Sequence, residues 1–255
     1  MVFDIESPPI ESLGARVGAR FDRKLFTPSD CAAEKEPLAF QQLPDEHGEA
    51  IRATNEWVTK FITKRVNKQG SREAICPFVE PSIKKKAIFY AIAQPDEPNE
   101  IDSIDQELRR FANVFHALEP KEMPASIVKS VVAIYPETRG PLLLEATDPK
   151  RDLKGDLLEA GILAGEFFST CPFATTFNPK LFALRSPHPM YVLRSFIDTD
   201  WRFIAQVERW RDIYHDRFGD PPEGLASIGT FRGRVMDKIR SIGARFGIQQ
   251  KRKRR

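Results

Sequence analysis

Side chains suited to proton transfer gather between residues 161 and 204. Glu166 stands between a glycine and two phenylalanines, and a carboxyl group in apolar surroundings can act as a general acid or base. The alternative is a strand-edge glutamate that faces water. His188, held between two prolines, is the second candidate for acid–base work, although a lone histidine is also an ordinary surface residue. His47 lies far from this stretch, and we expect it to be exposed.

Two arginines flank the apolar run at residues 190–193. Arg185 precedes it within a proline-rich turn, and Arg194 follows it directly. A guanidinium group holds a carboxylate or phosphate through two parallel hydrogen bonds, so the two residues predict a small anionic ligand. The alternative is structural, because each arginine could instead pair with a carboxylate of the domain or with loop carbonyls.

Cys76 opens a Cys-Pro-Phe tripeptide and could supply a thiolate to heme or to a substrate, if positive neighbours activate it. The alternative is a small buried residue ahead of a strand. Cys171 repeats the tripeptide within a loop, so the tripeptide alone does not indicate chemistry. Three distant cysteines predict no disulfide scaffold and favour a reducing, cytoplasmic location. No CxxC or HExxH pattern is present, so spacing predicts no metal site.

The elements that position these side chains alternate between helix and strand. Apolar residues at helical spacing predict helices over residues 45–66, 104–118 and 201–218, and we expect a further helix over residues 149–160. Continuous apolar runs predict strands over residues 87–93, 127–135 and 190–193. Pro77 and Pro81 argue against a regular helix between the first of these helices and the first strand. Two aspartates, Asp198 and Asp200, are expected to cap the last helix. This order predicts a mixed α+β layer fold.

Composition and proline spacing divide the 255 residues into three parts. Residues 1–48 are broken by prolines and predict an irregular arm that lies on the domain. Residues 49–220 form the α+β domain, because a hydrophobic content of 41% supplies a packed core. Residues 221–255 are a linker and a basic tail. No apolar run approaches the roughly 20 residues that cross a bilayer, and the N-terminus does not resemble a secretory signal.

The tail concentrates positive charge. Residues 229–255 hold ten Lys/Arg and one acid, a net of +9, so the preceding 228 residues carry −6 of the total of +3. Apolar residues from Ile228 to Phe246 recur at steps of three and four, which predicts a basic amphipathic helix. Residues 228–255 could lie on an anionic membrane surface or recruit an acidic partner. Packing on the acidic body and binding of nucleic acid are the alternatives.

Three motifs together resemble a bacterial and fungal family catalogued as domain of unknown function 6875. They are the Cys-Pro-Phe box at residues 76–78, the strand that ends in proline at residues 131–136, and a glycine-rich box with a downstream Leu-Arg-Ser-Pro segment. The last is matched by Gly161, Gly165, Glu166, Phe167, Asn178, Pro179, Leu184, Arg185, Ser186, Pro187 and Pro189. The resemblance covers about residues 50–218 and implies no particular reaction. The family often has His or Tyr at the position of Phe168, and Arg-His where Arg194 and Ser195 stand, so chemistry by those histidines would be lost or altered here.

The order of these boxes is also similar, more weakly, to that of the YqcI/YcgG family. Some members of that family are heme-dependent oxygenases that act on guanidine nitrogen. This similarity implies a cytoplasmic small-molecule tailoring enzyme, an oxidoreductase with heme as its cofactor. Two other hypotheses stand beside it. One is a non-catalytic module that binds a ligand through Arg185, and the other is a protein recruited to a membrane surface by its basic tail.

Overall fold

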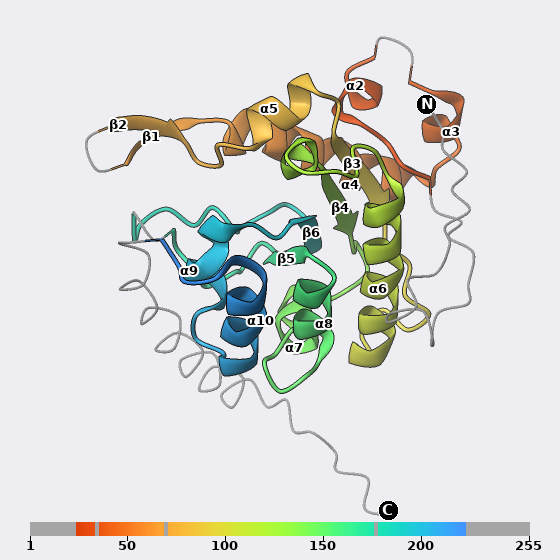
Figure 1. The fold of residues 1–255 in the computed structure, drawn as a ribbon. Helices are drawn as coiled ribbons and strands as arrows, with labels where there is room; N and C mark the ends of the chain where they lie inside the picture. Colours follow the sequence, from red (N-terminus) through yellow and green to blue (C-terminus); the bar gives the residue numbers. More distant parts are fainter. Residues whose placement is uncertain (1–23, 34–35, 69–70, 176–177, 223–255) are drawn as a thin grey trace, which may run out of the picture. The chain divides into compact units, whose positions relative to one another are not determined.

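A computed structural model describes residues 24–33, 36–68, 71–175 and 178–222 (Figure 1). The predicted amphipathic helix in residues 228–255 lies outside the described residues, as does the start of the predicted arm. The chain divides into two compact units, Met1–Phe196 and Ile197–Arg255, and each is described by itself.

The first unit is built on a four-stranded sheet with the strand order β3-β4-β6-β5. Strands β3 (Ile88–Ile92) and β4 (Ser130–Ile134) are parallel, whereas β6 (Met190–Ser195) runs antiparallel to β4 and to β5 (Ile162–Phe167). A parallel pair needs a crossover, which α6 (Ile101–Ala117) provides. The sheet and its helices confirm the predicted α+β class.

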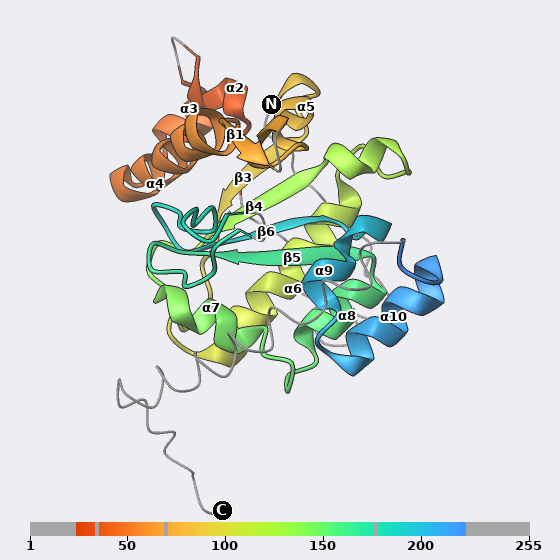
Figure 2. The same ribbon diagram turned by 90° about the vertical axis from the view of Figure 1, so that its left-hand side faces the viewer.

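Helices cover both faces of this sheet (Figure 2). On one face, α6, α7 (Gly140–Ala146) and α8 (Leu153–Glu159) supply residues of the same buried cluster as Val131 and Tyr191. On the other face, α4 (Asp45–Glu56) and its π-helical continuation η1 (Trp57–Ile62) pack over β3. Side chains alternate along a strand, so Glu166 of β5 points toward α7 and α8, and its neighbour Phe167 points to the opposite face.

Within residues 24–33 and 36–48, the described part of the predicted arm contains the short helices α2 (Pro28–Cys31) and α3 (Leu38–Gln41) and the first residues of α4. Ahead of α2, Phe26 forms an antiparallel bridge with Tyr90 on the free edge of β3. The two backbone N–H···O contacts of this bridge measure 2.9 and 2.7 Å. The arm is therefore tied to the sheet by backbone hydrogen bonds as well as by its buried side chains.

Several elements of the first unit differ from the sequence prediction. Pro81 lies within a helix, α5 (Val79–Lys84), because it occupies the first turn, where a backbone N–H has no helical partner to lose. The helix predicted to reach residue 66 ends at Ile62, and a hairpin of β1 (Arg65–Lys68) and β2 (Ser71–Ala74) follows it. Strand β5 is a fourth strand that the apolar runs did not predict. The strand predicted from residue 127 begins at Ser130, after a 3-10 turn, η2 (Ala125–Val128).

The described part of the second unit consists of η3 (Asp198–Asp200), α9 (Trp201–Ile204) and α10 (Glu208–Phe218). The single helix predicted over residues 201–218 is therefore broken, and Val207 between the two helices has an extended backbone. The predicted capping by the aspartates is also wrong for Asp200. Its carboxylate accepts the backbone N–H of Ile197 at 3.0 Å and closes the turn before the helix, so it does not cap α9.

Candidate functional site

Glu166 of β5 is buried against α8, and its side chain is 3% exposed. Its Oε1 accepts hydrogen bonds from Lys154 Nζ at 2.7 Å and from Thr147 Oγ1 at 2.6 Å. The interpretation of a glutamate that faces water is therefore wrong. Two opposite charges neutralise each other in the interior, where either one alone would be costly. The arrangement fastens α7 and α8 to β5.

Two tyrosines extend this buried layer. Tyr191 Oη donates to the carbonyl of Leu143 at 2.6 Å, and its ring meets the ring of Tyr135 edge to face at 5.5 Å. The hydroxyl of Tyr135 is buried and has no hydrogen-bond partner among the described residues. Burial raises the pKa of both phenols well above the usual value, so both stay neutral. The layer thus places a carboxylate, an ammonium group and two phenols in the interior of the protein.

Sequence reasoning passed over two buried lysines. Lys154 lies three and four residues before Leu157 and Leu158 and so shares the buried face of α8, which was the available signal that its charge needs an internal partner. The second is Lys129, whose Nζ donates to the carbonyl of Leu118 at the end of α6 at 2.7 Å and lies 4.4 Å from the ring of Phe115. Burial lowers the pKa of Lys129 to about 8. Its position at the C-terminal end of α6 suits a positive charge.

The two predicted arginines contact protein groups. Arg185 is exposed, but its Nε donates to the carbonyl of Cys171 at 3.1 Å and its guanidinium lies 3.9 Å from the ring of Phe182. Arg194 donates to the carbonyl of Ser195 at 3.0 Å and lies over the ring of Phe78 at 5.8 Å. Both arginines thus donate to backbone carbonyls, as in the structural alternative given for them. A ligand role for either arginine stays a prediction.

The predicted site residues do not form one site. His188 precedes the start of β6, which pairs with the end of β4, whereas Arg194 pairs with Ser130 at the start of β4. The two side chains therefore belong to opposite ends of the sheet. Burial lowers the pKa of His188, against a smaller opposite effect of the Glu49 carboxylate. Cys76 is partly exposed and follows the β1–β2 hairpin, with its backbone N–H donating to Ile62 at 3.4 Å.

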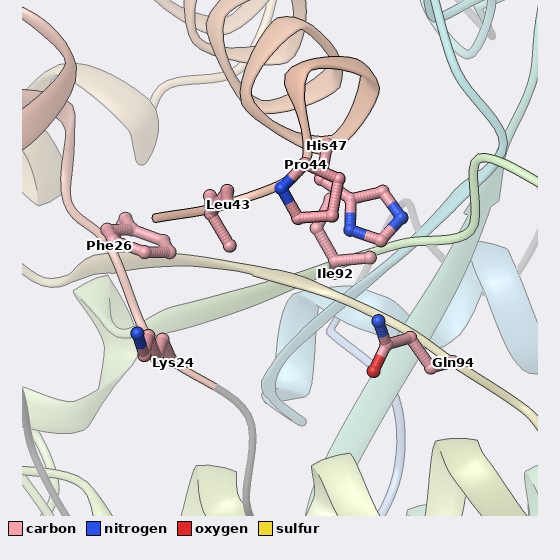
Figure 3. Close-up of a pocket in the computed structure, with 7 residues that line it drawn as sticks. All are labelled: Lys24, Phe26, Leu43, Pro44, His47, Ile92 and Gln94. Carbon is pink, nitrogen blue, oxygen red and sulfur yellow. The ribbon is translucent and has the colours of Figure 1, made fainter. Parts of the chain in front are cut away.

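A pocket of about 210 Å³ lies beside the carboxyl end of β3 (Figure 3). Figure 3 shows Pro44 and His47 on one side of it and Lys24 and Gln94 on the other. Apolar residues complete the wall, and the full lining consists of Lys24, Phe26, Leu43, Pro44, His47, Ile92 and Gln94. The region beyond the carboxyl ends of parallel strands is where open α/β sheets commonly bind ligands.

Three chain segments position the polar groups of this pocket. Lys24 precedes the bridge that fixes Phe26 on β3, and Gln94 follows β3, where its backbone N–H donates to Glu107 Oε1 at 3.0 Å. His47 lies in the first turn of α4 with its side chain 7% exposed, and its Nε2 is 4.0 Å from Glu137 Oε1.

The expectation that His47 is exposed is therefore wrong. Position 47 continues the buried face of α4, which includes Ala50, Ile51 and Thr54, so extending that stripe toward the N-terminus would have placed the imidazole inside. The pocket as a whole had no such signal. Its lining comes from residues that are distant in sequence and meet only because the arm pairs with β3.

Heme, the cofactor implied by the weaker resemblance, does not fit this pocket. Its volume of about 210 Å³ is below the 300–1,000 Å³ that is typical of sites for drug-sized molecules. His47 is the only residue of the lining that commonly ligates heme iron, and neither Cys76 nor His188 lines the pocket. The described residues also contain no group of three or more His, Cys, Asp or Glu side chains that could hold a metal ion.

No helix in the part of the chain that the structure describes is long and apolar enough to span a bilayer.

Comparison with known proteins identifies a family. Neither the curated proteins nor the solved structures give a match to the chain. A family model described as Domain of unknown function (DUF6875) matches residues 51–226, which is more than half of the 255 residues and contains α5, the whole sheet and the boxes at residues 76–78 and 161–189. The similarity to the YqcI/YcgG family stays a prediction, whereas the chain belongs to the DUF6875 family.

Proposed function

We propose that the protein binds a compact anionic molecule, such as a small carboxylate or phosphate, in the pocket beside β3. The observation that carries the proposal is the lining itself, which combines an amine, an imidazole and a carboxamide with an apolar wall. A few convergent polar groups on an apolar wall are typical of small-molecule sites. The volume of about 210 Å³ suits a compact molecule rather than a drug-sized one.

The sign of the ligand's charge follows from the residue types. Lys24 and His47 can carry positive charge, and no carboxylate lines the pocket. The first 228 residues carry a net charge of −6, so a pocket with basic side chains differs from the acidic body around it. Lys24 Nζ now donates to Gln42 Oε1 at 3.3 Å, a long contact to a neutral acceptor. An anion would be a better partner, because hydrogen bonds to charged groups are the stronger ones.

The His47–Glu137 pair favours a second candidate function, a small-molecule enzyme that uses acid–base chemistry. The separation of 4.0 Å places a carboxylate beside the imidazole, and Glu137 itself is exposed outside the lining. A carboxylate that orients one ring nitrogen leaves the other free to exchange a proton with a bound ligand. Under this hypothesis, His47→Gln weakens binding of an anionic probe and removes the proton exchange with the bound molecule.

The test begins with native mass spectrometry of freshly purified protein and a melting-temperature screen with phosphate, sulfate, acetate, succinate and malonate. We expect a co-purified small anion, or at least one probe that raises the melting temperature. Lys24→Met should then weaken binding of that probe about tenfold or more, because a hydrogen bond to a charged group contributes roughly 1.5–3 kcal/mol.

Lys150→Met is the matched control, because Lys150 is exposed and does not line the pocket. The control should bind like the unaltered protein. If no anion co-purifies and no probe raises the melting temperature, the proposal fails. It also fails if Lys24→Met and Lys150→Met bind the probe equally well.

A further inference from the structure

Residues 60–86, which we call the basic arm, carry a charge opposite to that of the rest of the body. They include the end of η1, the β1–β2 hairpin and α5. Two acids, Glu73 and Glu80, stand against eight bases: Lys60, Lys64, Arg65, Lys68, Arg72, Lys84, Lys85 and Lys86. The arm thus has a net charge of +6, although residues 1–228 as a whole carry −6.

The basic side chains of the arm are directed to solvent. Among those whose exposure the structure describes, all seven are exposed: Lys60, Lys64, Arg65, Arg72, Lys84, Lys85 and Lys86. Figure 1 shows the β1–β2 hairpin extending past α5 and away from β3 and β4. This arrangement presents the charges on a projecting element rather than on a flat surface.

The hairpin register places its two arginines on one face. Arg65 pairs with Ala74, and Asn67 pairs with Arg72, so positions 65, 67, 72 and 74 lie on the same side of the ribbon. Helix α5 packs against η1, which ends three residues before β1 begins, so the ribbon and α5 are neighbours. The ribbon and α5 therefore form one continuous basic surface.

Lys86 adds an observation on the backbone. Its φ of +54° lies in the left-handed region, where a glycine would be accommodated with less strain. Its N–H donates to Ile83 at 3.0 Å and closes the turn after α5. The chain therefore places a third consecutive lysine at a position that favours glycine, which keeps the positive charge at the end of α5.

We propose that the basic arm binds duplex DNA, with the β1–β2 ribbon entering the major groove and the lysines of α5 contacting phosphates beside it. A two-stranded antiparallel ribbon fits the major groove of B-form DNA. Arginine and lysine make most contacts to phosphates, and arginine and asparagine also donate to base edges. The proposal is independent of the pocket beside β3, because none of the lining residues belongs to the arm.

The composition of the arm favours DNA over a membrane surface. Binding at a membrane interface combines basic residues with apolar side chains that insert among the lipids. The large apolar side chains that the structure records as exposed are Leu38, Met123 and Phe203, and none of them lies in the arm. The apolar residues of the arm, among them Val66 and Phe78, are at least partly buried. The surface that remains for a partner is charged, as phosphates require.

Fluorescence anisotropy of a labelled 20-base-pair DNA duplex, titrated with the full chain at several salt concentrations, tests the proposal. The full chain retains the basic tail, whose charges can also bind DNA phosphates. The test therefore compares the affinities of variants with that of the unaltered protein and does not ask whether binding is absent. The ribbon variant is Arg65→Gln/Arg72→Gln, and the α5 variant is Lys85→Gln/Lys86→Gln. The control is Lys150→Gln/Lys180→Gln, which removes two exposed lysines outside the arm.

We expect both arm variants to bind the duplex about tenfold or more weakly than the unaltered protein. The slope of log K against log salt is negative, and it should become less steep by about 2 in each variant, because each lost phosphate contact reduces its magnitude by roughly 0.9. The control should change neither quantity, and all variants should keep the melting temperature. Unchanged affinity and slope in both arm variants would overturn the proposal, and so would an equal loss in the control. Binding to phosphatidylserine vesicles that depends on the arm, without binding to DNA, would also overturn it.

Discussion

The layer between β5 and α8 and the pocket beside β3 both hold charged side chains, but these charges face different partners. The carboxylate of Glu166 faces the ammonium group of Lys154 at 2.7 Å, and both are buried. Lys24 and His47 instead line an open volume of about 210 Å³. In the first region the fold supplies the counter-charge. In the second, Glu137 lies 4.0 Å from His47 but Lys24 donates to a neutral carboxamide, so a molecule from solution can supply the counter-charge of Lys24. Chemically suitable residue types therefore indicate a binding site only where their partners are external.

Removal of one member of the internal pair should have the largest effect. Glu166→Leu leaves Lys154 as a buried charge without a partner, and breaking a buried pair in this way costs roughly 3–5 kcal/mol. Urea denaturation should report this loss in the free energy of unfolding. The double variant Glu166→Leu/Lys154→Met removes both charges and should recover part of it. A loss below about 1 kcal/mol in the single variant would mean that the pair is not an internal anchor.

Lys129 is a buried ammonium group whose hydrogen-bond acceptor is a backbone carbonyl rather than a carboxylate. Its pKa of about 8 in the folded protein lies below the usual 10.5, so the contribution of this group to stability is greatest above pH 10.5 and decreases as the pH falls toward 8. Relative to Lys129→Met, the unaltered protein should gain stability as the pH rises from 8 to 10. A constant difference between the two proteins over this range would contradict the lowered pKa.

Gly140 sets how closely the loop that carries Arg185 can approach α7. A Cβ atom at Gly140 would lie 2.5 Å from the Cβ of Phe168, which is the first residue after β5. Gly140→Ala should therefore destabilise the protein by roughly 1–3 kcal/mol through overpacking. Combination with Phe168→Ala should relieve the clash, although the lost ring has its own cost. Thermal denaturation of the Gly140→Ala variant without any loss would show that the loop can move away.

Arg185→Ala should have the smallest effect. The variant loses one hydrogen bond to Cys171 and the stacking on Phe182, which together contribute roughly 1 kcal/mol at an exposed site. Affinity for an anionic probe of the pocket should not change. A tenfold loss of that affinity with unchanged stability would favour the ligand-binding role that the sequence predicts for Arg185.

Local patterns predicted the elements whose burial follows from their own residues. The apolar run of β3 and the helical stripe of α6 are of this kind. Strand β5 was missed because Gly165 and Glu166 interrupt its apolar run, and Glu166 is buried only because Lys154 neutralises it. The β1–β2 hairpin has charged residues on both faces, so it shows no alternation of apolar and polar residues.

The pocket could not be predicted for a different reason. Its lining depends on the bridge between Phe26 and Tyr90, which joins the N-terminal arm (residues 1–48) to β3 across many intervening residues. Spacing along the chain carries no information about such a contact. Four of the five predicted site residues, by contrast, lie between residues 161 and 204, and the structure places His188 and Arg194 at opposite ends of β6. Proximity in sequence was therefore a poor guide to the site.

The central claim is that the charges beside β3 are available to a ligand and that those around β5 and β6 are not. Calorimetric titration with the tightest anionic probe from the screen tests it in two double variants. Lys24→Met/His47→Gln alters the pocket, and Arg185→Ala/Arg194→Ala removes the arginines flanking β6. We predict that the first variant loses about a hundredfold or more in affinity and that the second binds the probe as the unaltered protein does. The opposite result, loss in the second and full affinity in the first, would contradict the claim.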